Sequence, residues 1–173
     1  DPEQFSPTTA VEKAAMRKQL GIAESAFVIG SFQKDGVGWE EGLEPKLIKG
    51  PDTFLEVIEK LKVSIPELFV LLAGPARGYV KQGLEKLGVP YRHDYLQDFN
   101  DLPGYYKALD LYLVTSREEG GPKAILESMA SKVPLVTTAC GQAVDLVKNA
   151  ENAWIAPVED ASQLSEAALE VYK

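Results

Sequence analysis

Residues 111–131 read LYLVTSREEGGPKAILESMAS, and this stretch decides the fold. An apolar run at 111–114 predicts a buried strand, the Gly-Gly pair a turn, and the remainder a helix. The N-terminus of such a helix attracts anions, because its free N–H groups point outward and its dipole is positive there. Glu119 and Glu127 bracket this turn and the start of the helix. Two carboxylates would repel a bare phosphate, so the pattern favours a ligand that also carries hydroxyls, such as a nucleotide sugar.

The composition is that of an ordinary globular domain. The chain has 173 residues, of which 45% are hydrophobic and 25% are charged. This size is typical of one domain, so residues 1–173 are expected to form a single ligand-binding unit. The net charge of −8 and the lack of a basic block argue against nucleic acid as a partner.

Three features bear on where the protein works. The single cysteine, Cys140, allows no internal disulfide and fits a reducing compartment. No apolar run reaches membrane-spanning length, and no signal peptide is visible. We therefore expect a cytoplasmic protein. The chain begins at Asp1 without a methionine, and we interpret it as a piece of a longer protein.

Short apolar runs alternate with amphipathic segments along the chain. This alternation predicts βαβ units and a parallel sheet whose strands are buried on both faces. The expected fold is α/β, a Rossmann-like, doubly wound sheet of six strands that binds ligands at the carboxyl ends of its strands. A capping box at 9–12 is expected to open the first helix, and Ser162 to cap the last. The expected strands are 27–32, 68–73, 91–95, 111–114, 135–138 and 153–156; the expected helices are 9–21, 52–62, 79–87, 102–109, 122–131, 142–149 and 162–173.

The connection from Gln33 to Lys49 is unusually long, since such loops typically have about 2–6 residues. It follows the first strand, where ligands bind in this kind of sheet, and it contains Trp39, a costly residue to leave exposed. We interpret the loop as functional. A tolerated surface insertion is the alternative.

The segment from Glu119 to Glu127 resembles the E-x7-E motif of retaining GT-B glycosyltransferases of the glycosyltransferase group 1 (family 4) type. The resemblance implies that the chain is the C-terminal, donor-binding half of a GT-B hexosyltransferase whose acceptor-binding N-terminal half is missing. The isolated piece is expected to bind a nucleotide-diphosphate sugar of the UDP or GDP type and not to turn over. Further matches to the family lie along nearly the whole chain, at 1–7 (DPEQFSP), 49–50 (KG), 108–110 (ALD) and 133–136 (VPLV).

The resemblance also implies roles for the two glutamates. Glu127 matches the residue that accepts hydrogen bonds from the ribose hydroxyls. Glu119 matches the residue that contacts the donor sugar and stabilises charge at its anomeric carbon, so Glu119 is the expected catalytic residue. Simpler interpretations exist for both. Glu127 can pair with Lys123 one helical turn away, and Glu119 can be an acidic residue favoured near a helix N-terminus.

The residues between the glutamates are expected to hold the diphosphate. Gly120 and Gly121 let the backbone approach the sugar closely, although a tight turn alone would also explain them. Pro122 suits the first position of a helix. The amides of Lys123 and Ala124 then face the pyrophosphate.

Lys49 matches the pyrophosphate-binding lysine of the family, and its compact ammonium group suits a phosphate. A solvated lysine is the alternative. Gly30, in the first strand, is expected to lie in the binding site. The family places an arginine directly after this glycine, but here Gly30 is followed by Ser31. Either the hydroxyl of Ser31 or the charge of Lys34 is expected to replace it.

The segment 93–95 is expected to line the nucleobase through main-chain groups, which places Tyr95 in the site. His93, the only histidine, is expected to be structural. Gly141 and Gln142 resemble a glycine loop of the family and either contact the donor or simply start a helix. Three further residues are expected to serve packing: Cys140, Tyr105 and Tyr106.

Neither an Asp-x-Asp pair nor a His/Cys cluster with metal spacing occurs, so we expect no bound metal and no cofactor. Lys49 and helix-terminus amides would then meet the charge of the leaving diphosphate. A membrane is expected to matter only indirectly, through a lipid acceptor. Two alternatives remain. A GT-B sugar-nucleotide epimerase would need an acid/base set not found in the sequence, and a flavodoxin-like binding module would not explain the two glutamates.

Overall fold

A parallel sheet of six strands forms the centre of the computed structural model, which describes residues 4–121 and 123–173. The strands lie in the order β3-β2-β1-β4-β5-β6, and every neighbouring pair is parallel. The order reverses between β1 and β4, which marks the switch point where such sheets bind ligands. The predicted Rossmann-like, doubly wound sheet is confirmed. Its strands are β1 (Phe27–Ser31), β2 (Leu68–Ala73), β3 (Tyr91–Asp94), β4 (Leu111–Val114), β5 (Leu135–Thr138) and β6 (Trp154–Ala156).

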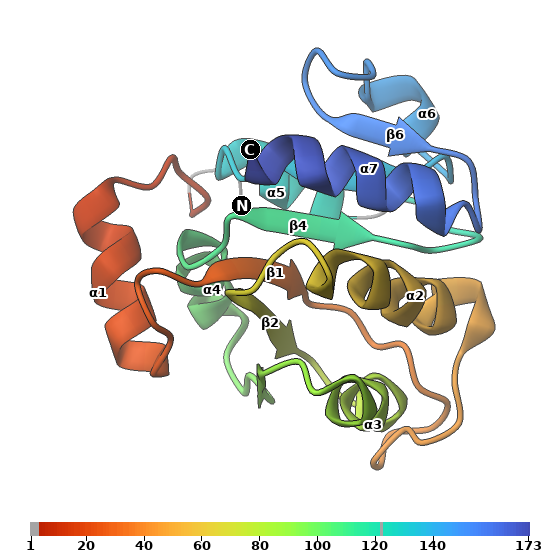
Figure 1. Ribbon diagram of the computed structural model, residues 1–173, viewed down its shortest axis with the longest axis horizontal. Helices are drawn as coiled ribbons and strands as arrows, with labels where there is room; N and C mark the ends of the chain where they lie inside the picture. Colours follow the sequence, from red (N-terminus) through yellow and green to blue (C-terminus); the bar gives the residue numbers. More distant parts are fainter. Residues whose placement is uncertain (1–3, 122) are drawn as a thin grey trace.

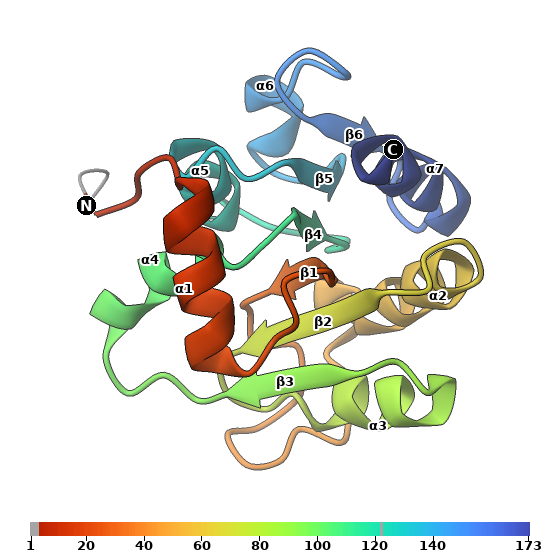
Figure 2. The same cartoon turned by 60° about the vertical axis from the view of Figure 1, so that its left-hand side comes forward.

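Helices cover both faces of the sheet (Figure 1). Figure 2 shows α2, α3 and α7 on one side and α1, α4 and α5 on the other. Two 3-10 turns, η1 (Leu47–Lys49) and η2 (Phe99–Asp101), precede α2 and α4. The helices are α1 (Ala10–Leu20), α2 (Pro51–Lys62), α3 (Gly78–Leu87), α4 (Leu102–Lys107), α5 (Lys123–Ala130), α6 (Ala143–Leu146) and α7 (Ala161–Tyr172).

The two helix layers create two hydrophobic cores, one on each face of the sheet. Strand β2 contributes to both, since Val70 and Leu72 pack in one core while Leu71 and Ala73 pack in the other. Alternate residues of a strand point to opposite faces, so a strand covered on both sides must be apolar throughout. This requirement explains the continuous apolar runs of the sequence.

Of the two helix N-caps predicted from the sequence, that of α1 is confirmed and that of α7 is wrong. The capping box is present at α1, where Thr9 and Glu12 exchange side-chain and backbone hydrogen bonds. The prediction that Ser162 caps the last helix is wrong. Asp160 takes that position, and its carboxylate accepts a hydrogen bond of 2.9 Å from the N–H of Gln163.

Most other element ends lie within one or two residues of the expected positions, and α6 is the main exception. It ends at Leu146, because the Asn152 side chain donates to the Leu146 carbonyl and accepts from the Lys148 N–H, which closes a turn in place of further helix. Within the part of the chain that the structure describes, no helix combines the length and the apolarity needed to cross a bilayer.

Candidate functional site

The segment between β4 and α5 is fixed to its neighbours by hydrogen bonds at its first two residues, Thr115 and Ser116. Thr115 Oγ1 donates to the Gly50 carbonyl at 2.8 Å, and Thr138 Oγ1 donates to the Ser116 carbonyl at 2.6 Å. A Cβ atom on Gly50, whose φ is +65°, would lie 1.8 Å from the Thr115 carbonyl oxygen. Only glycine therefore lets these two backbones meet.

Lys49 and Glu119 are brought together although 70 positions separate them. The Lys49 ammonium forms an ion pair with the Glu119 carboxylate, and both side chains are largely buried. The Ser116 hydroxyl donates a second hydrogen bond of 3.1 Å to the same Glu119 oxygen. Glu119, which is expected at the sugar, is thus held by Lys49, which is expected at the diphosphate.

Glu127 is held by an aromatic side chain. The Tyr106 hydroxyl, on α4, donates to Glu127 Oε2 at 3.0 Å. The alternative interpretation of Glu127 as half of a surface ion pair is wrong, because none of the ion pairs between described residues joins Lys123 to Glu127.

Two cavities meet at Glu119. The first, of about 540 Å³, also contains Glu127 and the first residues of α5. The second, of about 680 Å³, lies toward Lys49. The first cavity is lined by Gln4, Phe5, Phe32, Gln33, Phe99, Leu102, Val114, Glu119, Gly121, Lys123, Ala124 and Glu127. The second is lined by Lys46, Ile48, Lys49, Arg117, Glu118, Glu119, Gly120, Ala139, Cys140 and Gly141.

The glycine pair has free space above it. A Cβ atom on Gly120 would meet no atom within 4 Å, and one on Gly121 would make an ordinary contact of 3.5 Å with Gln142. Neither residue has a φ in the left-handed region, so the turn itself does not require glycine. The protein's own packing therefore leaves this backbone open to a ligand. Pro122, which was expected at the first helical position, lies outside the described residues.

The loop after β5 supports the segment from the opposite side. Gly141 has a φ of +52°, and a Cβ atom there would lie 1.9 Å from the Glu119 carbonyl oxygen. Gly141 thus packs on the backbone of Glu119 and also lines the second cavity.

The expectations for Gly30 and Ser31 are wrong, because neither residue lines either of the two cavities. Both are buried. A Cβ atom on Gly30 would lie 2.4 Å from Leu109, so this glycine makes room for a core side chain. The Ser31 hydroxyl accepts a hydrogen bond of 2.9 Å from Arg77 and is only 1% exposed as a residue, so it is not available to a diphosphate.

Arg77 bonds the residue that follows Gly30, at both its carbonyl and its hydroxyl oxygen. Its guanidinium, which is fully buried, forms a two-point pair with Asp35 at 2.9 and 3.1 Å. It also donates to the Ser31 carbonyl at 2.6 Å and to the Ala73 carbonyl at 2.8 Å. With the bond to the Ser31 hydroxyl, all five N–H donors of the guanidinium have partners. Arg77 is therefore a structural residue that anchors the start of the 33–49 loop.

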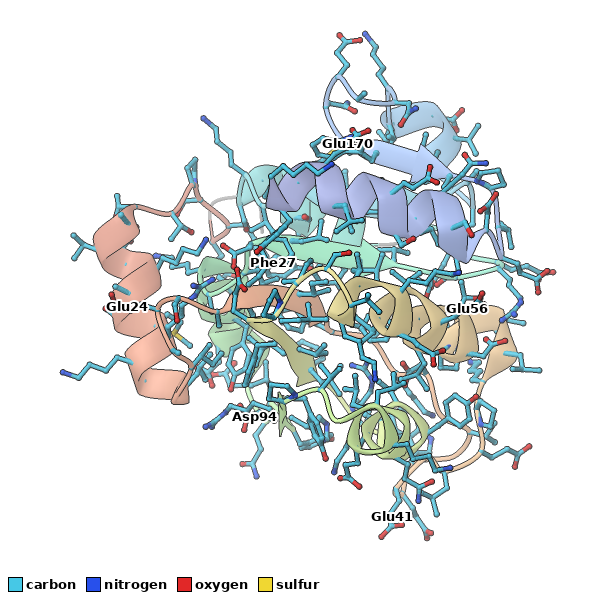
Figure 3. All side chains as sticks on the ribbon, viewed as in Figure 1. Glu24, Phe27, Glu41, Glu56, Asp94 and Glu170 are labelled. Atoms are coloured by element: carbon cyan, nitrogen blue, oxygen red, sulfur yellow. The ribbon has the colours of Figure 1, made fainter. Side chains whose placement is uncertain are left out.

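The middle of the 33–49 loop packs on the start of α3, while the two ends of the loop reach the cavities, Gln33 at the first and Lys46, Ile48 and Lys49 at the second. Glu41, labelled in Figure 3, lies at its outer end, and its carbonyl accepts a hydrogen bond of 2.6 Å from the Gly78 N–H. The Lys34 ammonium lies 3.7 Å from the centre of the Trp39 ring, and Trp39 is 78% exposed. Lys34 lines neither cavity, so the structure does not bring it to the diphosphate region.

The residues near the end of β3 lie at the surface or serve the fold. Tyr95 is exposed and lines neither of the two cavities. His93 Nε2 lies 2.7 Å from the Gly74 carbonyl oxygen, and burial lowers the pKa of this imidazole. The predicted structural role of His93 is confirmed.

Cys140 is buried beside the second cavity. Burial raises the pKa of its thiol, so the sulfur stays protonated and is a poor nucleophile at neutral pH. This agrees with its predicted packing role. In residues 4–121 and 123–173, no group of three or more His, Cys, Asp or Glu side chains is placed to hold a metal ion.

Three residues that shape the site were not identified from the sequence: Tyr106, Ser116 and Arg77. Tyr106 was assigned to packing, which its burial confirms, but its hydroxyl also contacts Glu127. Ser116 could have been found, because a serine three residues before a motif glutamate is within reach of that glutamate in a turn. Nothing in the local sequence points to Arg77.

Fold and site together define an α/β domain of the Rossmann class whose candidate ligand site lies at the switch point between β1 and β4. The family model "Glycosyl transferases group 1" matches residues 43–173, and the chain belongs to this family.

The relatives of the chain include named glycosyltransferases. The chain is 27% identical, over 97% of its length, to the lipopolysaccharide core biosynthesis mannosyltransferase LpsB of Rhizobium meliloti, of which it covers 47%. It is 24% identical over 99% of its length to a GDP-mannose-dependent phosphatidylinositol monomannoside mannosyltransferase of Corynebacterium glutamicum, of which it covers 44%. The chain thus spans about half the length of these curated relatives.

Several solved structures share the fold. Anabaena HepE, in complex with UDP and glucose, matches with a TM-score of 0.79 and 23% identity over 100% of this chain and 45% of its own. The C-terminal domain of the group 1 glycosyl transferase LpcC from Francisella tularensis matches with a TM-score of 0.78 and 20% identity, over 99% of this chain and 87% of its own. The fold is that of a GT-B C-terminal domain.

Proposed function

We propose that this chain binds the nucleotide-diphosphate-sugar donor of a retaining glycosyltransferase, which transfers a hexosyl group to an acceptor hydroxyl. The observation that carries the proposal is the first cavity, in which Glu119 and Glu127 lie on either side of the first residues of α5. A carboxylate only accepts hydrogen bonds when it is ionised, so it suits a sugar hydroxyl, and a helix N-terminus suits a phosphate.

The proposed donor lies along this cavity with its ribose at Glu127, its diphosphate at the amides of Lys123 and Ala124, and its sugar at Glu119. The open space above Gly120 and Gly121 supports this placement, since a sugar can approach the backbone there. Lys49 lies on the far side of Glu119, toward the second cavity, within reach of the same diphosphate.

The ion pair between Lys49 and Glu119 gives donor binding a defined first step. In the free protein, the ammonium neutralises the carboxylate that the sugar will need. A diphosphate carries more negative charge than one carboxylate, and it competes for the ammonium. Transfer of Lys49 from Glu119 to the diphosphate frees the carboxylate to accept hydrogen bonds from the sugar and to stabilise positive charge at the anomeric carbon.

Both common nucleotide types are candidates for the donor. UDP is bound in the structure of HepE, and the Corynebacterium relative is named as GDP-mannose-dependent. An epimerase with this fold would bind the same ligands, but the match to the glycosyl transferases group 1 family favours transfer. The acceptor is proposed to bind to a domain outside residues 1–173. A lipid acceptor and a cytoplasmic location stay predictions.

Thermal unfolding of the chain with UDP, GDP, ADP and their sugars tests donor binding. A nucleotide at about a hundred times its dissociation constant should stabilise the folded chain by roughly 2.7 kcal/mol. The expected result is a rise in Tm with one nucleotide type. No rise with any nucleotide at millimolar concentration would contradict the proposal.

Two substitutions separate the roles of the glutamates. Glu127→Ala should weaken every nucleotide that carries a ribose diol, with or without a sugar. Glu119→Ala should weaken the sugar nucleotide more than the bare diphosphate, because only the sugar contacts Glu119. Equal losses for both ligands would remove the sugar assignment of Glu119.

A further inference from the structure

Tyr106 is buried completely beneath the first cavity, yet its polar atom points at a residue that lines that cavity. Its ring stacks on Tyr112 with a centroid distance of 5.3 Å and an interplanar angle of 20°. Phe5 and Phe32 pack edge-on against it, at 5.6 and 5.1 Å. Tyr106 is 0% exposed, so these contacts surround the ring and hold the hydroxyl in place.

The hydroxyl of Tyr106 donates to Glu127 Oε2 at 3.0 Å. Burial raises the pKa of this phenol well above its ordinary value, so the hydroxyl keeps its proton and acts as a permanent donor. A carboxylate has about four lone-pair positions. One of them is taken by Tyr106 from below, and the others remain for a ligand in the cavity.

We propose that Tyr106 is the positioning residue for ribose recognition: its rigid hydroxyl holds the Glu127 carboxylate in the orientation that receives a vicinal diol. This inference rests on the proposed function, in which Glu127 binds the ribose. Without the hydroxyl, the Glu127 side chain would rotate freely about its terminal bonds. The carboxylate would then lose the fixed geometry that distinguishes a diol from a single hydroxyl.

The chain contains a matched control in the neighbouring residue. Tyr105 lies on the same helix and also donates its hydroxyl to a carboxylate, that of Asp94, at 2.8 Å. It packs edge-on against Phe32, as Tyr106 does. Tyr105→Phe therefore removes an equivalent hydrogen bond from the same aromatic cluster without touching Glu127.

The experiment compares the affinity of a ribonucleoside diphosphate with that of its 2′-deoxy counterpart. The tightest of UDP, GDP and ADP is titrated into the wild type, Tyr106→Phe and Tyr105→Phe, and its 2′-deoxy form is titrated into the same three proteins. We expect Tyr106→Phe to reduce the preference for the ribose form by about three- to tenfold, which corresponds to the net contribution of one typical hydrogen bond. Tyr105→Phe should leave the preference unchanged within about twofold.

A ratio of affinities separates positioning from general structural damage. Loss of packing would weaken both nucleotides equally and would leave the ratio unchanged, which would overturn the role of Tyr106. In the background of Glu127→Ala, removal of the Tyr106 hydroxyl should not change the ratio further. If Tyr106→Phe does not fold, Tyr106→Met, whose flexible side chain occupies part of the same space without a hydroxyl, must show the same loss.

Nucleotide binding by the wild type tests the role of Tyr106 and the proposed function separately. If the wild type binds no nucleoside diphosphate, the proposed function and the role of Tyr106 fall together. If the wild type binds one but does not prefer the ribose form, donor binding stands, and the roles of Glu127 and Tyr106 in ribose recognition fall.

Discussion

The loops after β1 and after β4 start at the same end of the sheet and both contain glycines, but their glycines serve opposite purposes. In the 33–49 loop, a Cβ atom on Gly42 would lie 2.3 Å from the Ala76 carbonyl oxygen. In the segment after β4, a Cβ atom on Gly120 would meet nothing within 4 Å. The first glycine is required by the protein's own backbone, and the second leaves space for something that is not part of the protein.

The two loops also differ in how they use charge. Asp35 of the first loop is used inside the protein, since it forms a buried pair with Arg77, which follows β2, and every donor of that guanidinium has a partner. The second leaves its charges accessible, because Glu119 and Glu127 line a cavity. An arginine or a glycine near a sheet edge therefore indicates a ligand site only when the surrounding protein neither pairs the charge of the arginine nor fills the space beside the glycine.

The largest expected effect is that of breaking the buried pair. Arg77→Met should lower the free energy of unfolding by about 3–5 kcal/mol, because it leaves the Asp35 carboxylate buried without a partner. Urea unfolding measures this loss. The double variant Asp35→Leu/Arg77→Met should recover part of it, since no buried charge remains. A loss below about 1 kcal/mol in Arg77→Met would show that the pair does not anchor the loop.

The next effect contrasts the two kinds of glycine directly. Gly42→Ala should destabilise the protein by at least about 2 kcal/mol, because an alanine at a φ of +69° is strained and its Cβ collides with the backbone. Gly120→Ala should change stability by less than about 0.5 kcal/mol but should weaken sugar-nucleotide binding. Unfolding curves of both variants measure the change in stability, and binding titrations of both measure the change in sugar-nucleotide affinity. Similar losses of stability in the two variants would erase the distinction between the loops.

A smaller effect of opposite sign is expected from Glu119→Gln. This change releases Lys49 from its ion pair, so the bare nucleoside diphosphate should bind about three- to tenfold more tightly. The preference for the sugar nucleotide over the diphosphate should fall in the same titration. Glu118→Gln is the control, since Glu118 is exposed and adjacent in sequence. Weaker diphosphate binding by Glu119→Gln would be evidence against the exchange of Lys49 between the two partners.

The smallest effect concerns an ion pair between the segment after β4 and the start of α2. The Arg117 guanidinium bonds both oxygens of Asp52, at 2.8 and 2.7 Å, and holds the pKa of that carboxyl below its ordinary 3.8. A depressed pKa means that the pair stabilises the fold at pH values above 3.8 and stops doing so as the pH falls through the lower, folded-state pKa. Asp52→Asn should therefore cost about 0.2–1 kcal/mol at pH 7 and nothing in strong acid. Denaturant unfolding of the wild type and Asp52→Asn at both pH values measures this cost. An equal difference in the free energy of unfolding at the two pH values would contradict the prediction.

The sequence predicted the sheet well because strand burial is a local property. The expected and observed bounds agree at 68–73, 111–114 and 135–138. The first two are continuous apolar runs flanked by polar residues or Gly. The cap of α7 was predicted two residues too late, because Asp160 and Ser162 both have capping side chains. The backbone of the preceding turn decides between them, and the pattern of residues does not describe that backbone.

Apart from Lys49, which the family resemblance supplied and which lies 70 positions from Glu119, the site was predictable only where its residues are close in sequence. Glu119, Gly121, Lys123 and Ala124 follow one another along the chain, and the structure places them in one cavity with Glu127. The error at Ser31 arose from Arg77, which lies 46 positions away and occupies its hydroxyl. The bond from Tyr106 to Glu127 spans 21 positions and two helices, so no local pattern contains it.

The contact between Gly50 and Thr115 has a consequence for protein engineering. The two residues follow different strands, yet their backbones touch, and the Thr115 hydroxyl closes the contact by bonding the Gly50 carbonyl. A designer who transplants the E-x7-E segment into another Rossmann scaffold must therefore carry Lys49 and Gly50 along with it. The smallest transferable unit of this site is a pair of segments, not a single motif.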